Sequence, residues 1–322
     1  MHLLAEFLLN TFGKEIFVTK GGQCFQKQPS SSILNILDLR STHKEADHRI
    51  ALHTVYASRN GDKVCVVSDD TDVYILLLFI SAKCEGKVYM RQGTSDATSY
   101  HDIDALASVL GENICNILPA FHALTGCDYT FNFFFRTKSR AFNTMMSKPQ
   151  SYKMLLSLYS QNVVFDDIVD YVIHIIYNRP KKEKSLLDSR YAMIYVGKGK
   201  KKKFASTKKI PPDEQSLFQK TKRAHLVSYS YYNCLQNDFI PMIPEQSGWM
   251  IDQGILIPIS YFGACLPTVE EYSRAVGEAS DKVDSTNEDE EEVSDDDDAE
   301  RLCSSDDEVE SGEESENSDD DI

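Results

Sequence analysis

Three short stretches of this sequence place acidic side chains where they could bind a divalent cation. They are His43–Asp47, Ser68–Asp72 and Gly126–Tyr129. In the second stretch, three carboxylates within four residues repel one another unless a cation or a helix N-terminus compensates their charge. Carboxylate oxygens are hard ligands that suit Mg²⁺ or Mn²⁺. Two such ions about 4 Å apart activate water and stabilise the leaving oxygen in phosphodiester hydrolysis.

The local pattern indicates what would position these groups. Lys63–Val67 is a short apolar run that leads directly into the acidic Ser68–Asp72. A buried parallel strand has this pattern, and ligands of open α/β sheets bind beyond the carboxyl ends of such strands. The first acidic stretch lies at the start of a helix that Thr42 and Glu45 would begin as a capping box. The third follows a helix that Gly126 would end.

Hydrophobic periodicity and turn residues predict the remaining elements. Expected strands are Glu15–Thr19, before a Gly21-Gly22 turn, Val64–Val67 and Lys87–Arg91. Expected helices are Leu3–Phe12, Thr42–Ser58, Asp72–Ala82, Ile103–Leu110, Ile114–Leu124 with a kink at Pro119, Tyr152–Tyr159 and Ile168–Tyr177. Strands that alternate with helices predict an α/β sandwich with a mainly parallel sheet.

Composition divides the chain into a mildly basic body and a strongly acidic tail. The 322 residues carry a formal net charge of -16, of which Asp281–Ile322, with 22 acidic and two basic residues, accounts for -20. We expect residues 273–322 to be disordered, since they offer too little apolar surface to offset the entropy of ordering. Residues 1–148 are predicted to form the α/β domain, and 149–272 a helical and irregular extension, rich in Pro and Tyr, packed on it.

The chain is expected to be a soluble intracellular protein. Its longest apolar run, Val73–Ile80, is too short to span a bilayer, so no membrane partner is expected. Cys65, Cys115 and Cys127 lie in apolar surroundings and are expected to be reduced core residues. The basic run Lys198–Lys203 favours the nucleus over the cytoplasm, although such a run is commonly a solvated loop.

The three acidic stretches, in this order, resemble the flap-endonuclease/XPG branch of the PIN-like nucleases, which have a Rossmann-like sandwich. His122–Asp128, which reads His-Ala-Leu-Thr-Gly-Cys-Asp, also resembles a group of animal proteins with that motif. The nuclease resemblance covers residues 41–145. It implies a metal-dependent nuclease in which carboxylates gather around two Mg²⁺ or Mn²⁺ ions, and DNA or RNA as the partner. By motif, the catalytic and metal-binding residues would be Glu45, Asp47, Asp70, Asp72 and Asp128.

Two departures from the family pattern accompany this resemblance. The family's first strand, which ends in a metal-binding Asp, has no clear counterpart before residue 41, so the domain is expected to be incomplete at its N-terminus. The family's glycine-rich helix-hairpin-helix is replaced by Thr130–Arg136. Phosphate contacts would then come from Arg136, Lys138 and Arg140.

Each acidic residue also has a purely structural explanation. Glu45 could close a capping box with Thr42. Asp69, Asp70 and Asp72 could cap the following helix and complement its dipole. Asp128 could be an ordinary turn residue. His122, among apolar neighbours, is expected to be a satisfied core histidine rather than a ligand.

Three functions are therefore open at the sequence level. The first is a metal-dependent nuclease, which would be inactive if its first metal-binding strand is missing. The second is a non-catalytic module that binds nucleic acid or protein. The third is an interaction protein whose acidic tail engages basic partners.

Overall fold

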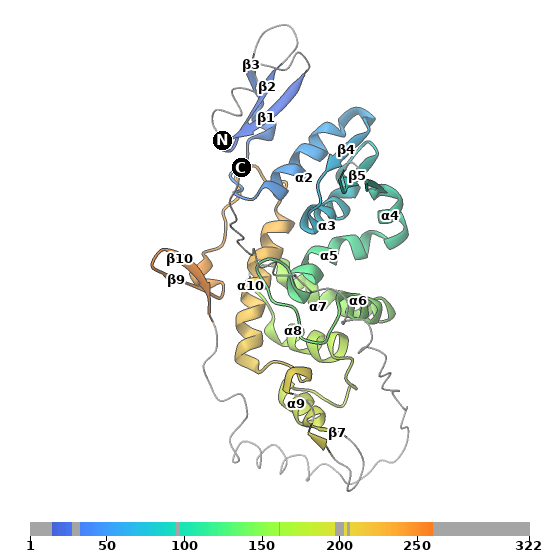
Figure 1. Cartoon of the computed structure of the whole chain (residues 1–322), viewed down its shortest axis with the longest axis vertical. Helices are drawn as coiled ribbons and strands as arrows, with labels where there is room; N and C mark the ends of the chain where they lie inside the picture. Colours follow the sequence, from blue (N-terminus) through green and yellow to red (C-terminus); the bar gives the residue numbers. More distant parts are fainter. Residues whose placement is uncertain are drawn as a thin grey trace, which may run out of the picture. The chain divides into compact units, whose positions relative to one another are not determined.

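The computed structural model describes residues 15–27, 33–94, 97–160, 162–196, 203–204 and 207–259 (Figure 1). All of them belong to one compact unit, residues 1–263. The helix predicted near the N-terminus, most of the basic run after Lys198 and the acidic tail lie outside the described residues.

An antiparallel sheet of three short strands begins the described chain. It consists of β1 (Ile16–Lys20), β2 (Gln23–Lys27) and β3 (Ile33–Asn35). Gly21 and Gly22 have φ of 57° and 81°, which is the left-handed region that a tight two-residue hairpin turn requires. The first strand and its turn are thus confirmed within one residue.

A second sheet contains β4 (Val64–Val67), β5 (Val88–Gln92) and β6 (Ser99–Asp102), in that order. β4 and β5 are parallel, and α3 (Thr71–Ile80) lies between them in the chain. β5 and β6 are antiparallel. The protein is therefore a mixed α/β structure, but a mainly parallel sheet is not confirmed, because the other described pairings are antiparallel.

The predicted helices around this sheet are present. They are α2 (Ala46–Ala57), α3, α4 (Ile103–Leu110) and α5 (Glu112–Thr125), and α3 packs against α2, α4 and α5. The prediction that Thr42 and Glu45 form a capping box is wrong, however. Glu45 is the N-cap residue of α2 without a side-chain cap bond, and Thr42 Oγ1 instead donates to the carbonyl of Phe239 at 2.9 Å.

Pro119 interrupts the hydrogen bonding of α5, because proline has no N–H to donate. The buried hydroxyl of Tyr159 lies at this point. It donates to the Asn116 carbonyl at 2.7 Å and accepts from the Ala120 N–H at 3.1 Å, two groups that are four residues apart on the helix. A side chain from η5 (Ser157–Tyr159) thus satisfies backbone groups next to Pro119, where the kink is expected.

The second half of the described chain is helical, with two small hairpins. Its elements are α6 (Lys138–Ser147), α7 (Tyr152–Leu156), α8 (Phe165–Tyr171), α9 (Leu186–Ile194), α10 (Glu214–Tyr232), β7 (Tyr195–Val196) with β8 (Lys203–Phe204), and β9 (Trp249–Asp252) with β10 (Ile255–Pro258). Short 3₁₀ or π turns are η1 (Leu37–Leu39), η2 (Arg59–Gly61), η3 (Ser81–Lys83), η4 (Pro149–Ser151), η5 (Ser157–Tyr159), η6 (Val172–Ile176), η8 (Thr207–Lys209) and η9 (Pro244–Gln246).

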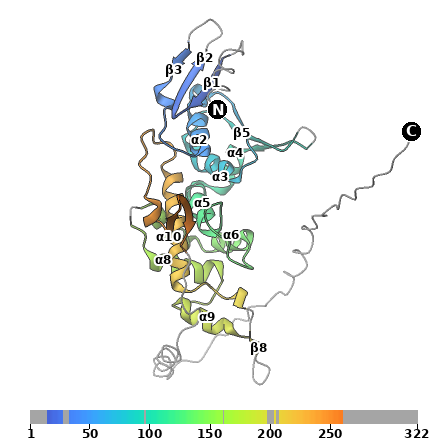
Figure 2. The same ribbon diagram turned by 60° about the vertical axis from the view of Figure 1, so that its left-hand side comes forward.

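The long helix α10 is the main element that the sequence did not predict. It lies beside α5, as Figures 1 and 2 both show, and buries Leu217, Ala224 and Val227 in the same core. Its sequence has no simple apolar stripe, because buried Lys220, Arg223 and His225 also face inward. The expected irregular segment is therefore, between Glu214 and Tyr232, a helix central to the core.

Two further expectations can be compared with the described residues. Their cysteines are free, but only Cys115 of the three named above is buried; Cys65 is exposed and Cys127 half-buried. None of the described helices combines the length and apolar character that a membrane span needs.

Candidate acidic site

The five acidic residues come from three element ends. Glu45 and Asp47 lie at the N-terminus of α2, Asp70 and Asp72 at the N-terminus of α3, and Asp128 in the turn after α5. Partial positive charge at the two helix N-termini offsets some of the repulsion between these carboxylates.

Electrostatics show that these groups lie near one another. The pKa of Asp47 is raised to about 6, first by burial and then by the negative charges of its acidic neighbours, which are Asp70, Asp72, Glu45 and Asp128. All four other predicted site residues therefore act on one carboxyl group. Each of the causes that shift the pKa of Asp47 raises it, so the neighbouring carboxylates disfavour the ionised form of this group.

One hydrogen bond connects two of the three element ends directly. The Tyr129 hydroxyl donates to Glu45 Oε1 at 2.7 Å, across 84 positions of sequence. Burial, followed by this bond and the nearby carboxylates, raises the pKa of Tyr129, so the hydroxyl keeps its proton and remains a donor. Tyr129 thereby holds the Asp128 turn against the start of α2.

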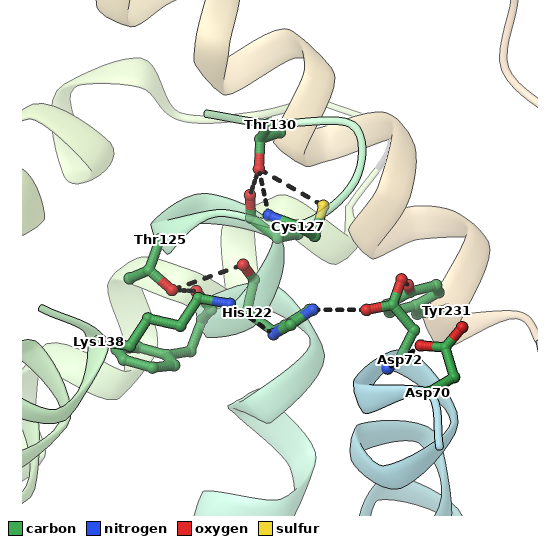
Figure 3. Close-up of polar contacts among 10 residues, drawn as sticks. Asp70, Asp72, His122, Thr125, Cys127, Thr130, Lys138 and Tyr231 are labelled. Carbon is green, nitrogen blue, oxygen red and sulfur yellow. Dashed lines mark hydrogen bonds and ion pairs between the residues drawn. The ribbon is translucent and has the colours of Figure 1, made fainter. Parts of the chain in front are cut away.

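Asp72 differs from the other four because it is buried and both of its carboxylate oxygens accept hydrogen bonds from side chains (Figure 3). His122 Nε2 donates to its Oδ1 at 2.6 Å, and the Tyr231 hydroxyl donates to its Oδ2. Lys138 Nζ lies 3.1 Å from His122 Nδ1. Since a lysine ammonium only donates, Nδ1 accepts and the ring proton sits on Nε2, facing Asp72.

This buried network reverses the effect of burial on Asp72. Burial raises the pKa of the carboxyl, but the hydrogen bonds from His122 and Tyr231, with the positive charge of Lys138, outweigh it and lower the pKa below its usual range. Asp72 is thus ionised and buried, whereas Glu45, Asp70 and Asp128 are exposed.

The structural explanations hold for some of these residues. Asp70 caps α3, since its Oδ1 accepts the Asp72 N–H at 2.8 Å. Asp69 accepts the Gly93 N–H at 2.6 Å and so connects the end of β4 to the loop after β5. Asp128 lies in a tight turn that two backbone bonds between Cys127 and Thr130 close, at 3.1 and 3.0 Å. These roles leave carboxylate oxygens available, so they do not exclude a binding role.

The three predicted phosphate-binding residues are in different environments. The Arg136 guanidinium lies 4.8 Å from the ring centroid of Tyr177, and half-buried Lys138 contacts His122. Arg140 is exposed on α6. The expected basic surface is therefore only partly present at these positions.

Sequence reasoning missed Tyr231, and it left His48 out of the site as an exposed residue at a helix end, which is wrong as to its exposure. Tyr231 comes from α10, 159 positions away from Asp72, and no local pattern indicates it. His48 is buried and stacks on His43 at 4.6 Å between ring centroids. Burial, and then the His43 charge, lower the pKa of His48 to about 3, so the ring is neutral. By contrast, the expected burial of His122 is confirmed.

The site fits a divalent cation in its chemistry more than in its present geometry. Its oxygen donors suit Mg²⁺ or Mn²⁺, and the raised pKa of Asp47 shows charge that a cation would neutralise. Yet in the described part of the chain, no three His, Cys, Asp or Glu side chains are placed to hold a metal ion. Binding would require the carboxylates to come closer together than they are in this structure.

A groove of about 1030 Å³ lies on another face of α2. Phe17, Arg49, His53 and Val66 are among the residues that line it, together with Lys44 and Ala46. None of the five acidic residues lines this groove, so its size does not bear on the acidic site.

Comparison with protein-family models, with curated proteins and with solved structures finds no match to this chain.

Proposed function

We propose that this protein is a divalent-metal-dependent nuclease of the PIN-like class, which hydrolyses phosphodiester bonds of DNA or RNA. The observation that carries the proposal is the convergence of three element ends: the Tyr129 hydroxyl joins the Asp128 turn to Glu45, and burial with the four neighbouring carboxylates raises the pKa of Asp47 to about 6. Evenly solvated acidic surface residues would not have this effect on one another.

The acidic residues and their neighbours would have different roles in this reaction. Glu45, Asp47, Asp70 and Asp128 would hold Mg²⁺ or Mn²⁺. Asp72 would act from below, since His122 and Tyr231 fix both of its oxygens. When bound, the metal would activate water and stabilise charge on the leaving oxygen. Tyr129 would keep Glu45 oriented toward the other carboxylates.

The decisive experiment incubates the purified full chain with Mn²⁺ or Mg²⁺ and labelled single-stranded, flap and duplex substrates. We expect metal-dependent cleavage that Asp47→Asn and Asp128→Asn reduce by about 100-fold or more. Asp69→Asn is the matched control, because Asp69 bonds to the Gly93 N–H and is not among the charges that act on Asp47.

Melting temperatures of all variants verify that each is folded. Intact substrates under every metal condition would refute the proposal, and so would equal loss of activity in Asp69→Asn.

A second candidate is a non-catalytic module that binds nucleic acid or protein. It is favoured by the absence, within the described residues, of three side chains placed for a metal. Nucleic-acid binding that weakens steeply with salt, ignores Mg²⁺ and occurs without cleavage would support this candidate over the nuclease.

A further inference from the structure

The loop after the Asp128 turn exposes three phenylalanines. Phe131, Phe134 and Phe135 have 71%, 54% and 56% of their surface exposed, whereas Phe133 between them is 6% exposed. Phenylalanine at such exposure has an unfavourable contact with water. The three lie within five residues of one loop, and the rings of Phe134 and Phe135 are in contact, so they are not scattered single exposures.

Buried contacts fix the position of this loop. The Phe133 ring packs edge-on against Tyr177, with centroids 6.2 Å apart. Lys220 Nζ lies 4.6 Å from the centroid of Phe133 and donates to the Phe131 carbonyl. Phe133 therefore acts as an anchor, and the exposed rings project from a held backbone.

Phe135 adopts a backbone conformation that its side chain disfavours. Its φ is +54°, in the left-handed region where a Cβ crowds the backbone. Glycine would occupy this position without strain. A bulky aromatic residue that is both strained and exposed contributes little to folding, so folding does not account for it.

Lysines from a distant segment lie over the exposed rings. Lys208 Nζ is 5.5 Å from the centroid of Phe134, and Lys209 Nζ is 5.5 Å from that of Phe135. The rings of Phe134 and Phe135 are perpendicular, with centroids 4.5 Å apart. The surface thus combines flat aromatic faces with positive charge.

We propose that this aromatic loop, Phe131, Phe134 and Phe135 with Lys208 and Lys209, binds single-stranded nucleic acid. Unpaired bases would stack on the rings, and the lysines would contact phosphates. A duplex hides its base faces and cannot stack in this way. The inference builds on the proposed nuclease function and specifies its substrate class.

Another exposed apolar surface of the described chain lacks this combination. The β9–β10 hairpin exposes Met250, Ile251, Ile255, Leu256 and Ile257. These aliphatic side chains offer no flat π-face. Unpaired bases can therefore stack on the aromatic loop, but not on these side chains of the hairpin.

The test measures fluorescence anisotropy of the full chain in EDTA with labelled oligothymidylate, oligouridylate and a blunt hairpin duplex. We expect both single strands to bind more tightly than the duplex, and their relative affinity identifies DNA or RNA. Phe134→Ala should weaken binding about tenfold, and the double variant with Phe135→Ala about 100-fold. Lys208→Ala with Lys209→Ala should reduce the salt slope by about 1.4.

Three variants separate recognition from folding. Phe135→Gly should lose affinity while its Tm stays equal or rises, because the backbone strain is removed. Phe134→Trp should retain affinity, whereas Phe134→Leu should not, because leucine lacks a flat face. Phe218→Ala is the matched control, since Phe218 also lies beneath a lysine, with Lys222 Nζ 4.7 Å from its centroid.

Several results would overturn the inference. They are equal affinity for duplex, affinity unchanged in the double alanine variant, full affinity in Phe134→Leu, or no oligonucleotide binding at all. Cleavage in Mn²⁺ is scored separately. Tight single-strand binding without cleavage would support this inference and refute the nuclease proposal. Cleavage that the loop variants leave unchanged would support the nuclease proposal and refute this inference.

Discussion

Asp47 and Asp72 are acidic residues of one cluster, each in the first turn of a helix, yet they ionise in opposite ways. Burial and four neighbouring carboxylates raise the pKa of Asp47 to about 6. Asp72 is more deeply buried, but donors surround it and its pKa is lowered. Burial raises the pKa of both carboxyl groups, so the partners of each group decide the difference between them.

This difference separates two regions with distinct roles. Around Asp72, hydrogen bonds from His122 and Tyr231 and the nearby positive charge of Lys138 compensate the negative charge of the carboxylate. This region therefore needs no bound cation. Around Asp47, the causes of its pKa shift include no cationic side chain of the described residues, which is the property expected of a surface that binds a cation. Four measurements test this contrast and one, on His48, tests burial of the neighbouring histidine; the five follow in order of decreasing effect.

The largest effect should come from Asp72→Ala. It leaves the buried donors of His122 and Tyr231 without their acceptor, which should cost about 3–5 kcal/mol in the free energy of unfolding. Urea denaturation measures this loss. Asp128→Ala, at an exposed position, should change stability by less than about 0.5 kcal/mol. Similar values for both variants would contradict the contrast.

His48 should make the protein sensitive to acid. Its pKa is lowered from 6.5 to about 3, so the unfolded chain takes up a proton that the folded chain refuses. This contribution to stability is complete above pH 6.5 and is lost as the pH falls toward 3. We expect a loss of about 2 kcal/mol at pH 5, measured by denaturation at several pH values. His48→Gln should show a correspondingly flatter profile; an unchanged profile would exclude this residue as the cause.

Mn²⁺ should stabilise the protein by neutralising the charge around Asp47. At ten times its dissociation constant, a bound ion contributes about 1.4 kcal/mol, or about 3–5 °C in Tm. Differential scanning fluorimetry should show this shift at pH 7.5 and a smaller one at pH 5, where Asp47 is protonated. A shift of equal size in Asp47→Asn with Asp128→Asn would place the ion elsewhere.

Asp47→Asn should stabilise the metal-free protein. Because the folded pKa of about 6 exceeds the unfolded value of 3.8, the penalty is absent below pH 3.8 and complete above pH 6. We expect a gain of about 1 kcal/mol at pH 7, after allowance for solvent screening at this half-buried group, and none at pH 3.5. A loss of stability at pH 7 would show that the surroundings of Asp47 are already compensated.

The smallest effect should come from Tyr129→Phe. It removes the hydrogen bond to Glu45 at a partly exposed position, which should cost about 0.5–1 kcal/mol in unfolding free energy. In a nuclease, the same change should weaken activity more than stability, because Glu45 would no longer be oriented. Unaltered cleavage by a correctly folded Tyr129→Phe would rule out that orienting role.

The sequence by itself determined the local elements around the candidate site. The apolar run Val64–Val67 is the strand β4, Ile103–Leu110 is the helix α4, and Asp70 caps α3. Each depends on residues within one or two turns of chain. The same local reading failed at Thr42, because its hydroxyl bonds to a segment almost 200 positions away.

Only the tertiary structure decided the state of each carboxyl group. Asp72 is ionised because α10 brings Tyr231 and α5 brings His122 to it. The pKa of Asp47 is raised because three element ends converge around it. Likewise, Phe133 is buried and Phe134 exposed although they are sequence neighbours. Electrostatic and packing energies depend on distance in space, which a linear pattern of residue types does not contain.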